Sequence, residues 1–345
     1  MTWPGEAAAM SEFHEHHALR EHWHAVATEH ELLGGPVGRT VLGDSLVLYL
    51  DENGEAVAAE DRCPHREAPL SEGRIEDGRL VCPYHGWSFG AGGRCARIPS
   101  ADPSLPLPRN GNLRTVHVTR RYGLVWVCLA DVPGELPVIR QDVDPAFRRI
   151  NSPVEHWQAC ALRMTDNFLD IAHFPWVHTG TFGNSQRTEV GRIELEMLDD
   201  GYFGYAYDVE AENPLGATLV SGQKTSTVLR RMTTGFKLPF AVRSTILYET
   251  GLEHIILLLS TPVDAVRSLF TFVVWRNDDF RVSAEEAIAF DRMIGAEDKR
   301  MLERIPGVLP LTSRALASTQ SDKASTAWRL QFAKLLGLSQ HYNED

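Results

Sequence analysis

Two short blocks of the chain combine cysteine and histidine at spacings that suit a metal cluster. Cys63 and His65 flank a proline, and after sixteen intervening residues Cys82 and His85 stand three apart. Two thiolates and two imidazoles are the ligand set of a Rieske [2Fe–2S] centre, with the cysteines on one iron and the histidines on the other. Because neutral imidazoles replace two thiolates, such a cluster has a higher reduction potential than an all-cysteine cluster. The two blocks therefore predict a one-electron carrier.

The same four side chains could instead hold a structural zinc ion, since zinc also accepts a Cys₂His₂ set. In a zinc finger, however, the cysteines usually form one pair along the chain and the histidines another. Here each block carries one of each, as Cys-x-His and Cys-x-x-His. This alternation favours the iron–sulfur cluster.

A second set of possible metal ligands lies in residues 167–178. Asn167, Asp170 and His173 are three apart, a spacing that predicts one shared helix face. His178 follows His173 by five residues, which on a regular helix would turn it about 140° away. Pro175 lies between the histidines and is expected to disturb or end the helix, so that His178 can return beside His173. Two unrelated histidines at a helix end are the alternative.

A carboxylate from elsewhere could complete a 2-His-1-carboxylate site, which holds non-haem Fe(II) on one face and leaves positions open for O₂. The helix predicted from Ser283 to about Ile305 offers Asp291 and Asp298, seven apart and nearly aligned on an apolar stripe. A carboxylate on such a stripe is costly unless it is paired or bound to metal. Glu297 points about 100° away and is expected to be a poor ligand. The pattern itself does not choose between the two aspartates.

The elements that must position these residues are mainly strands. From Arg39 to Ala130 short aliphatic runs alternate with turn residues, and Asn53-Gly54 is a strong hairpin signal. Asp131–Pro145 contains three prolines and one glycine, which is typical of an irregular exit from a domain. We therefore predict an antiparallel β domain over residues 20–132, preceded by an N-terminal extension over residues 1–19.

Strand patterns predominate again up to about Val274, and their spacing predicts one curved antiparallel sheet. Helices are predicted to begin near Arg163, at the Ser283 capping box and at about Asp322. The fold class is therefore α+β, with a second domain over residues 133–345. The weak candidates for its substrate pocket are aromatic residues, which on strands more often belong to the core: Phe182, Phe203 and Tyr205.

The first thirty residues are rich in histidine: His14, His16, His17, His22, His24 and His30. The segment Glu12–His24 is predicted to be a surface helix that leads into a strand. Its histidines fall on several faces, so we expect solvated side chains and no metal site.

The composition is that of an ordinary globular protein. Of the 345 residues, 43% are hydrophobic and 23% are charged. The net charge of −12 and the lack of a basic stripe argue against nucleic-acid binding. The five cysteines show no disulfide framework, no apolar run is long enough to span a bilayer, and residues 1–10 do not have the pattern of a signal peptide. We therefore expect a cytoplasmic protein that does not enter a membrane.

The two motifs together resemble those of the oxygenase components of Rieske non-haem iron oxygenases. CPH…CPYHGW from Cys63 to Trp87, followed by D-x-x-H-x-x-x-x-H from Asp170 to His178, is the paired signature of that family. The resemblance covers nearly the whole chain and is greatest to the branch of vanillate O-demethylase, dicamba monooxygenase and the saxitoxin-pathway hydroxylases. It implies a Rieske domain joined to a helix-grip catalytic domain, in a homotrimer of identical subunits.

The resemblance also implies roles for individual residues. His173, His178 and a carboxylate, Asp298 by the match to the family, would hold the mononuclear Fe(II). Asp170 would bridge His173 to a Rieske histidine of the neighbouring subunit, here His85. Asn167 would lie just behind the iron ligands: its part, like that of Asp170, would be to support catalysis.

The implied function is that of a terminal oxygenase, which uses O₂ and externally supplied electrons to hydroxylate or oxidatively demethylate a small organic substrate, aromatic or a secondary metabolite. The chain has no G-x-G-x-x-G after a strand and no Cys₄ run, so it should depend on a separate reductase, ferredoxin or both, using NAD(P)H. Ring cis-dihydroxylation is the alternative within the family. A Rieske electron-transfer protein or a zinc-stabilised binding module would be the alternatives of another class, but neither would need His173, His178 and Asp298.

Overall fold

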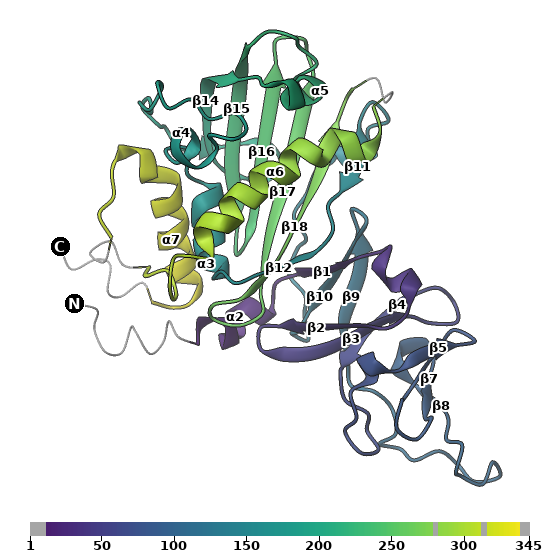
Figure 1. Cartoon of the computed structure of the whole chain (residues 1–345). Helices are drawn as coiled ribbons and strands as arrows, with labels where there is room; N and C mark the ends of the chain where they lie inside the picture. The colour runs from purple at the N-terminus through teal and green to yellow at the C-terminus, as the bar shows by residue number, and fades with distance from the viewer. Residues whose placement is uncertain (1–11, 279–281, 312–315, 339–345) are drawn as a thin grey trace. The chain divides into compact units, whose positions relative to one another are not determined.

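The computed structural model describes residues 12–278, 282–311 and 316–338 (Figure 1). The chain forms two compact units, one made of His17–Leu136 and the other of the described residues on either side of it. Antiparallel sheets form most of both units and a few helices accompany them. The predicted α+β class is therefore confirmed.

The unit His17–Leu136 contains two antiparallel sheets and the short helix α2 (His17–Arg20). Its six-stranded sheet has the order β1-β10-β9-β4-β3-β2, and its four-stranded sheet the order β5-β6-β7-β8. The strands are β1 (His24–Thr28), β2 (Val37–Val41), β3 (Asp44–Leu50), β4 (Ala56–Glu60), β5 (Arg74–Glu76), β6 (Arg79–Val81), β7 (Ser88–Phe89), β8 (Cys95–Arg97), β9 (Thr115–Arg121) and β10 (Leu124–Cys128). Gly54, with a φ of 75°, makes the turn between β3 and β4 that the Asn-Gly pair predicted.

The core of this unit includes the two blocks that carry cysteine and histidine. Cys63, Cys82 and Trp87 belong to one cluster of buried side chains together with residues of β3, β4 and the smaller sheet. Cys95 is in the same cluster and Cys128 is buried in β10, as expected of packing residues. The loops of the two blocks therefore rest on a rigid β framework.

The second unit is built on one antiparallel sheet of long strands. Its order is β11-β18-β17-β16-β15-β14-β13, and β12 pairs with β18. The strands are β11 (Arg148–Asn151), β12 (Glu155–Trp157), β13 (Glu196–Met197), β14 (Phe203–Glu212), β15 (Thr227–Lys237), β16 (Ala241–Tyr248), β17 (Glu253–Pro262) and β18 (Ser268–Arg276). The strand patterns that were predicted to continue up to about Val274 correspond to this sheet, whose last strand, β18, ends at Arg276.

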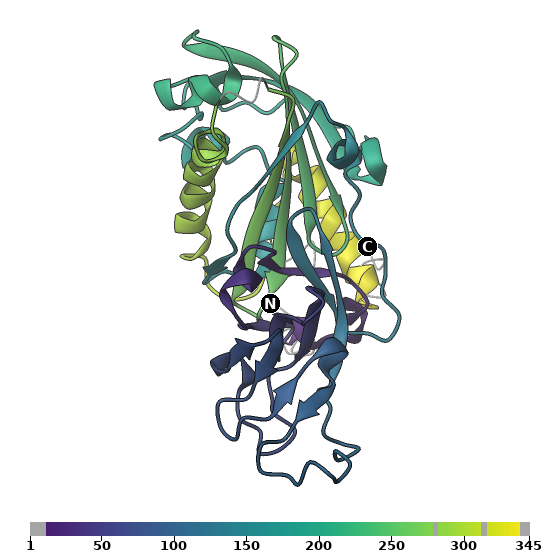
Figure 2. The same cartoon turned by 90° about the vertical axis from the view of Figure 1, so that its right-hand side faces the viewer.

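The helices of this unit are α3 (Ala161–Phe168), α4 (Phe174–Val177), α5 (Thr218–Ser221), α6 (Ala284–Leu302) and α7 (Lys323–Leu335). Figures 1 and 2 show the long helix α6 lying across one face of the sheet. Ser283 caps it with the predicted capping box, in which Ser283 and Glu286 bond to each other's backbone N–H. α6 ends at Leu302, three residues before the predicted end near Ile305.

The prediction that Asn167, Asp170 and His173 share one helix face is wrong. α3 ends at Phe168, so the chain leaves the helix before Asp170 and enters α4 only after His173. Pro175 lies in the first turn of α4. At that position a helix needs no N–H from the residue, so the proline begins a helix where it was expected to end one.

The predicted surface helix over Glu12–His24 is also wrong. The segment is broken into a 3₁₀ turn (Phe13–Glu15), α2 and the start of β1. His14 and His24 are buried rather than solvated. Nε2 of His24 lies 2.9 Å from Leu19 O, and burial lowers the pKa of His24 to about 4, so it is a neutral core histidine.

No helix in the described part of the chain is long and apolar enough to cross a membrane.

Candidate metal centres and substrate pocket

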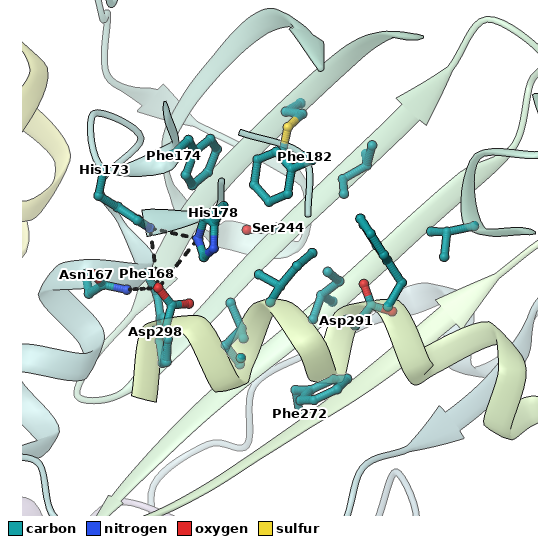
Figure 3. Close-up of a pocket in the computed structure, with 18 of the residues that line it drawn as sticks. Asn167, Phe168, His173, Phe174, His178, Phe182, Ser244, Phe272, Asp291 and Asp298 are labelled. Carbon is teal, nitrogen blue, oxygen red and sulfur yellow. Dashed lines mark hydrogen bonds and ion pairs between the residues drawn. The ribbon is translucent and has the colours of Figure 1, made fainter. Parts of the chain in front are cut away.

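Two histidines and an aspartate converge at a pocket of the second unit (Figure 3). Nε2 of His173 lies 3.2 Å from Nε2 of His178, and Oδ1 of Asp298 lies 3.5 Å from each of them. The three ligand atoms all lie within 4.8 Å of one another, close enough for one ion with bonds of about 2 Å to join them. Two imidazoles and one carboxylate match the ligand set of a non-haem Fe(II) site with open positions.

The outer nitrogen of His173 faces Asp170. Nδ1 of His173 lies 2.8 Å from Asp170 Oδ2, and the same carboxylate accepts the backbone N–H groups of Ala172 and His173. Asp170 therefore holds both the ring and the turn that follows α3. Burial acts to lower the pKa of His173, but hydrogen bonds to Asp170 and Asp298, and the charges of both carboxylates, raise it to about 9.

Glu297 takes the corresponding place behind His178. Its Oε2 accepts hydrogen bonds from His178 Nδ1 at 3.0 Å and from Thr181 Oγ1 at 2.8 Å, while Oε1 accepts one from Gly180 N at 3.1 Å. Gly180 permits this approach because a Cβ there would lie 2.5 Å from Glu297 Oε1. Burial lowers the pKa of His178, which favours the neutral imidazole that binds metals. With Nδ1–H directed at Glu297, Nε2 is left for an ion.

Asn167 holds the carboxylate of the group. Its Nδ2 donates a hydrogen bond of 3.0 Å to Asp298 Oδ1, the same oxygen that faces both histidines. Because Asn167 is in α3 and Asp298 in α6, this bond ties the two helices together at the site.

Asp291, the other aspartate of the predicted helix, does not approach the histidine pair. Its Oδ2 lies 3.3 Å from Nε2 of His254, further along the pocket. The structure therefore brings Asp298, and not Asp291, to His173 and His178. Glu297 is not among the three converging ligands, yet it contacts the site from behind, a role that its helix position alone did not reveal.

The pocket beside this group has a volume of about 110 Å³. A single water needs about 10–15 Å³ on the same scale, so the pocket has room for a small organic molecule. Phe182 lines it, but the other two aromatic candidates do not. Tyr205 donates its hydroxyl to Leu169 O at 2.9 Å, and Phe203 packs edge-on against Phe236.

Arg230 also lines the pocket and was missed in the sequence. β15 buries alternate residues, and Arg230 lies on the buried face between Val228 and Met232. An arginine at an inward position of an apolar strand face is the signal that could have identified it. No comparable signal indicated Thr181.

The four cluster residues form two pairs in the unit His17–Leu136. Cys63 and Cys82 are buried, and their thiols are close enough to share a hydrogen bond. The rings of His65 and His85 are exposed, with centroids 4.5 Å apart. Burial, with a contribution from Cys82, raises the pKa of Cys63 to about 11, so a bound metal is needed to keep it as a thiolate.

The two loops have matching backbone geometry. In each loop the backbone N–H of the cysteine donates a hydrogen bond to the carbonyl oxygen of the residue five positions later. The carbonyl oxygen of the cysteine accepts one from the backbone N–H of the residue four positions later, and all four bonds are 2.8–3.1 Å long. The residue that closes this turn is left-handed in both loops, Glu67 at φ 61° and Gly86 at φ 69°. The loops therefore present their cysteines and histidines in equivalent ways.

The two pairs do not converge on one point. A single zinc ion with bonds of about 2.0–2.3 Å would draw all four ligand atoms together. Among the described residues, His173, His178 and Asp298 are the group whose ligand atoms all lie within 4.8 Å of one another. No three of the ligand atoms of Cys63, His65, Cys82 and His85 come together in this way. Two thiols in one pair and two imidazoles in another fit a cluster of two irons, and not one zinc ion.

Comparisons with known proteins agree with this geometry. Residues 22–118 match the Rieske [2Fe-2S] domain, and residues 157–337 match the vanillate O-demethylase oxygenase C-terminal domain. The chain belongs to the Rieske non-haem iron oxygenases. This oxygenase is 30% identical to the methylxanthine N1-demethylase NdmA of Pseudomonas putida over 325 residues, which cover 91% of the chain and 88% of NdmA.

Two solved structures resemble the whole oxygenase. NdmA of Pseudomonas putida with caffeine matches with a TM-score of 0.80 at 28% identity, covering 95% of this chain and 94% of that one. Dicamba monooxygenase bound to 3,6-dichlorosalicylic acid matches with a TM-score of 0.76 at 27% identity, covering 93% and 98%.

Membership of the family defines the class of reaction. The protein is an oxidoreductase, a terminal oxygenase component that uses O₂ to hydroxylate or oxidatively demethylate a small organic substrate. Its cofactors are a Rieske [2Fe–2S] cluster and a mononuclear iron, and its electrons come from a separate electron-transfer partner. An electron-transfer protein and a zinc-stabilised binding module are thereby excluded.

Proposed function

We propose that His173, His178 and Asp298 hold the mononuclear iron of this oxygenase. The observation that carries the proposal is the convergence of two Nε2 atoms and one carboxylate oxygen at a largely apolar pocket. Iron bound there would supply the activation of O₂ beside the substrate.

The residues around this triad orient its ligands. Asp170 and Glu297 accept the Nδ1 protons of His173 and His178, so Nε2 is the atom of each ring that is turned toward Asp298. The pKa of His173 is raised to about 9, so this ring would have to release its Nε2 proton when a metal binds. Asn167 fixes the carboxylate oxygen of Asp298 that faces both rings. The chain thus positions three ligand atoms before any ion arrives.

We further propose that Cys63 and Cys82 hold one iron of the Rieske cluster, and His65 and His85 the other. The buried thiol pair and the exposed imidazole pair support this division. The proposed Rieske domain covers residues 20–132 and the catalytic domain residues 133–345, after an extension over residues 1–19. The compact unit His17–Leu136 supports these boundaries.

The proposed reaction is hydroxylation, or O- or N-demethylation, of an aromatic or secondary-metabolite substrate. Support comes from the names of the relatives, a methylxanthine N1-demethylase and a dicamba monooxygenase bound to 3,6-dichlorosalicylic acid. The phenylalanines around the pocket give it flat apolar walls that suit a planar ring: Phe168, Phe174, Phe182, Phe270, Phe272 and Phe290. No feature of the pocket favours ring cis-dihydroxylation.

Assembly and electron supply complete the proposal. In a homotrimer, His85 of one subunit would hydrogen-bond to Asp170 of the next, and Asp170 in turn contacts His173. The exposed rings of His65 and His85 offer an entry for electrons from an NAD(P)H-dependent reductase or ferredoxin. None of the five cysteines, all of which lie in the described part of the chain, forms a disulfide, which suits a reducing cytoplasm.

The test is metal analysis followed by a substrate screen. Purified protein should contain about three irons and about two labile sulfides per chain and show a rhombic Rieske signal when reduced. Substrate-stimulated O₂ uptake with a surrogate reductase should then identify substrates that yield a hydroxylated or demethylated product. Bound zinc in place of iron, or cluster iron without the additional iron, would contradict the proposal.

A further inference from the structure

Arg230 places a positive charge in the wall of the pocket. The residue is only 3% exposed, and within the described part of the chain its Nε and Nη2 have no hydrogen-bond partner. A buried charge is costly unless it is paired and hydrogen-bonded. Among the described residues no carboxylate forms an ion pair with the guanidinium, so an anion bound in the pocket would stabilise it.

Arg230 stands close to the metal-ligand group. Its Cζ lies 5.3 Å from the centre of the Phe182 ring and 5.5 Å from that of Tyr248. Phe182 in turn stacks on the imidazole of His178, with centroids 5.0 Å apart. One aromatic ring thus separates the guanidinium from a proposed iron ligand, so a single small molecule could contact Arg230 and still reach the iron site.

The other charged groups nearby lie beside residues other than Arg230. Arg276 donates to Asp278 at 3.0 Å and to Nδ1 of His254 at 2.6 Å. Because a guanidinium only donates, Nδ1 of His254 must accept, and its Nε2–H faces Asp291 Oδ2 at 3.3 Å. Asp291, the carboxylate that lines the pocket with Arg230, thus lies within ion-pair distance of His254, although its Oδ2 has no hydrogen-bond partner among the described residues. It forms no ion pair with Arg230 in the part of the chain that the structure describes.

Tyr248 adds a second unused donor beside Arg230. Its hydroxyl is buried and has no hydrogen-bond partner among the residues that the structure describes. Burial raises the pKa of Tyr248, so the hydroxyl keeps its proton and can donate it in a hydrogen bond. A guanidinium and a hydroxyl that both lack acceptors match the several lone pairs of a carboxylate or a similar oxyanion.

We infer that this oxygenase selects substrates that carry a carboxylate or a similar oxyanion, which Arg230 and Tyr248 bind while the rest of the molecule lies against the phenylalanines toward the triad. The inference deepens the proposed function and rests on it for the place of reaction. The predicted affinity for an anionic ligand does not depend on the proposed function, because Arg230 and Tyr248 are present whether or not iron is bound.

The test compares two probes of nearly equal shape, 4-methoxybenzoate and 4-methoxybenzamide. Each is titrated calorimetrically into the resting holoenzyme without O₂ or reductant. The benzoate should bind at least about tenfold more tightly, since a hydrogen bond to a charged group contributes more than one to a neutral group. Arg230→Gln should abolish this preference. Arg231→Gln is the matched control and should retain it, because Arg231 is the next residue of β15 and is exposed on the other face.

Circular dichroism and the melting temperature show whether Arg230→Gln is folded. If it is not, Arg230→Lys decides, because lysine keeps the charge but lacks the planar fork of donors and should lose several-fold of the preference. Equal affinity for the two probes, no binding of the benzoate, or an unchanged preference in the Arg230 variants would overturn the inference. Because the titration involves no turnover, a failure to form product would count against the proposed function alone.

Discussion

The direction in which each ring nitrogen faces determines what the site can bind. His173 and His178 both direct Nε2 at Asp298 and Nδ1 at a second carboxylate. A neutral imidazole carries one N–H and one lone pair, so a carboxylate on Nδ1 leaves Nε2 as the ligand atom. The two histidines are thus prepared for a metal by contacts that they make elsewhere.

Replacement of Asp298 should remove the mononuclear iron. Asp298→Ala leaves two imidazoles, too few to hold Fe(II) firmly, so we expect the loss of about one iron per chain, complete loss of turnover and an unchanged Rieske signal. Asp291→Ala is the control, because Asp291 is in the same helix and equally buried but lies beside His254. Iron analysis with electron paramagnetic resonance distinguishes the two variants. The assignment fails if Asp291→Ala is the variant that loses iron.

Replacement of Asp170 should slow electron transfer without removing a cofactor. Asp170→Asn keeps the shape of the side chain but loses its charge and one acceptor oxygen, which weakens the contact with His173. We expect both iron centres to remain and reoxidation of the reduced cluster to slow by at least about tenfold. Single-turnover stopped flow with substrate and O₂ measures this rate. Reoxidation at the wild-type rate would leave Asp170 with a purely structural role.

At the scale of elements, α6 supplies two carboxylates that act on the same imidazole from opposite sides. Asp298 faces Nε2 of His178 while Glu297, the preceding residue, reaches Nδ1 and the turn at Gly180. Consecutive helix residues diverge by about 100°, so both contacts are possible only because His178 lies between the two directions. The short helix α4 places it there.

Removal of the charge of Glu297 should weaken iron binding without removing a ligand. In Glu297→Gln a neutral amide replaces the carboxylate behind His178, and changes of this kind typically lower metal affinity about 10–100-fold. Competition with a chelator, on protein that retains its cluster, measures the change. Glu285→Gln is the control, since Glu285 is in the same helix but exposed and remote from the histidines. If Glu297→Gln binds iron as tightly as the control, Glu297 would serve only to hold the backbone turn at Gly180 and Thr181.

At the scale of the whole molecule, the two proposed iron centres belong to different compact units. The cysteine and histidine blocks lie in His17–Leu136, while His173, His178 and Asp298 lie in the other unit. Each set is held by hydrogen bonds and packing within its own unit. Loss of one centre should therefore leave the other able to form.

Cys63→Ser tests this independence. Loss of one thiolate should abolish the rhombic signal and reduce the iron content from about three to about one per chain. The remaining iron should still bind nitric oxide and give the spectrum of a non-haem Fe(II) nitrosyl. Cys95→Ser is the matched control, because Cys95 is buried in the same core without belonging to either block. Loss of both centres in Cys63→Ser would show that the units depend on each other.

Much of the chemistry could be predicted from the sequence because its ligands come in local patterns. Cys63 with His65 and Cys82 with His85 are each held within one tight loop, so spacing alone pointed to the cluster. The contact between His173 and His178 was also expected, although the predicted cause was wrong. The histidines meet because α3 ends before Asp170 and α4 begins after His173, and not because a proline interrupts one helix.

Tertiary structure decided whatever depended on partners distant in the chain. Asp291 and Asp298 are equivalent on the apolar stripe of α6, and only the position of α6 over the sheet brings Asp298 to the histidines and Asp291 to His254. The isolation of Arg230 likewise depends on which carboxylates the folded chain places near it. Sequence periodicity specifies the face on which a side chain lies, whereas its charge and hydrogen-bond partners depend on the elements that pack against that face.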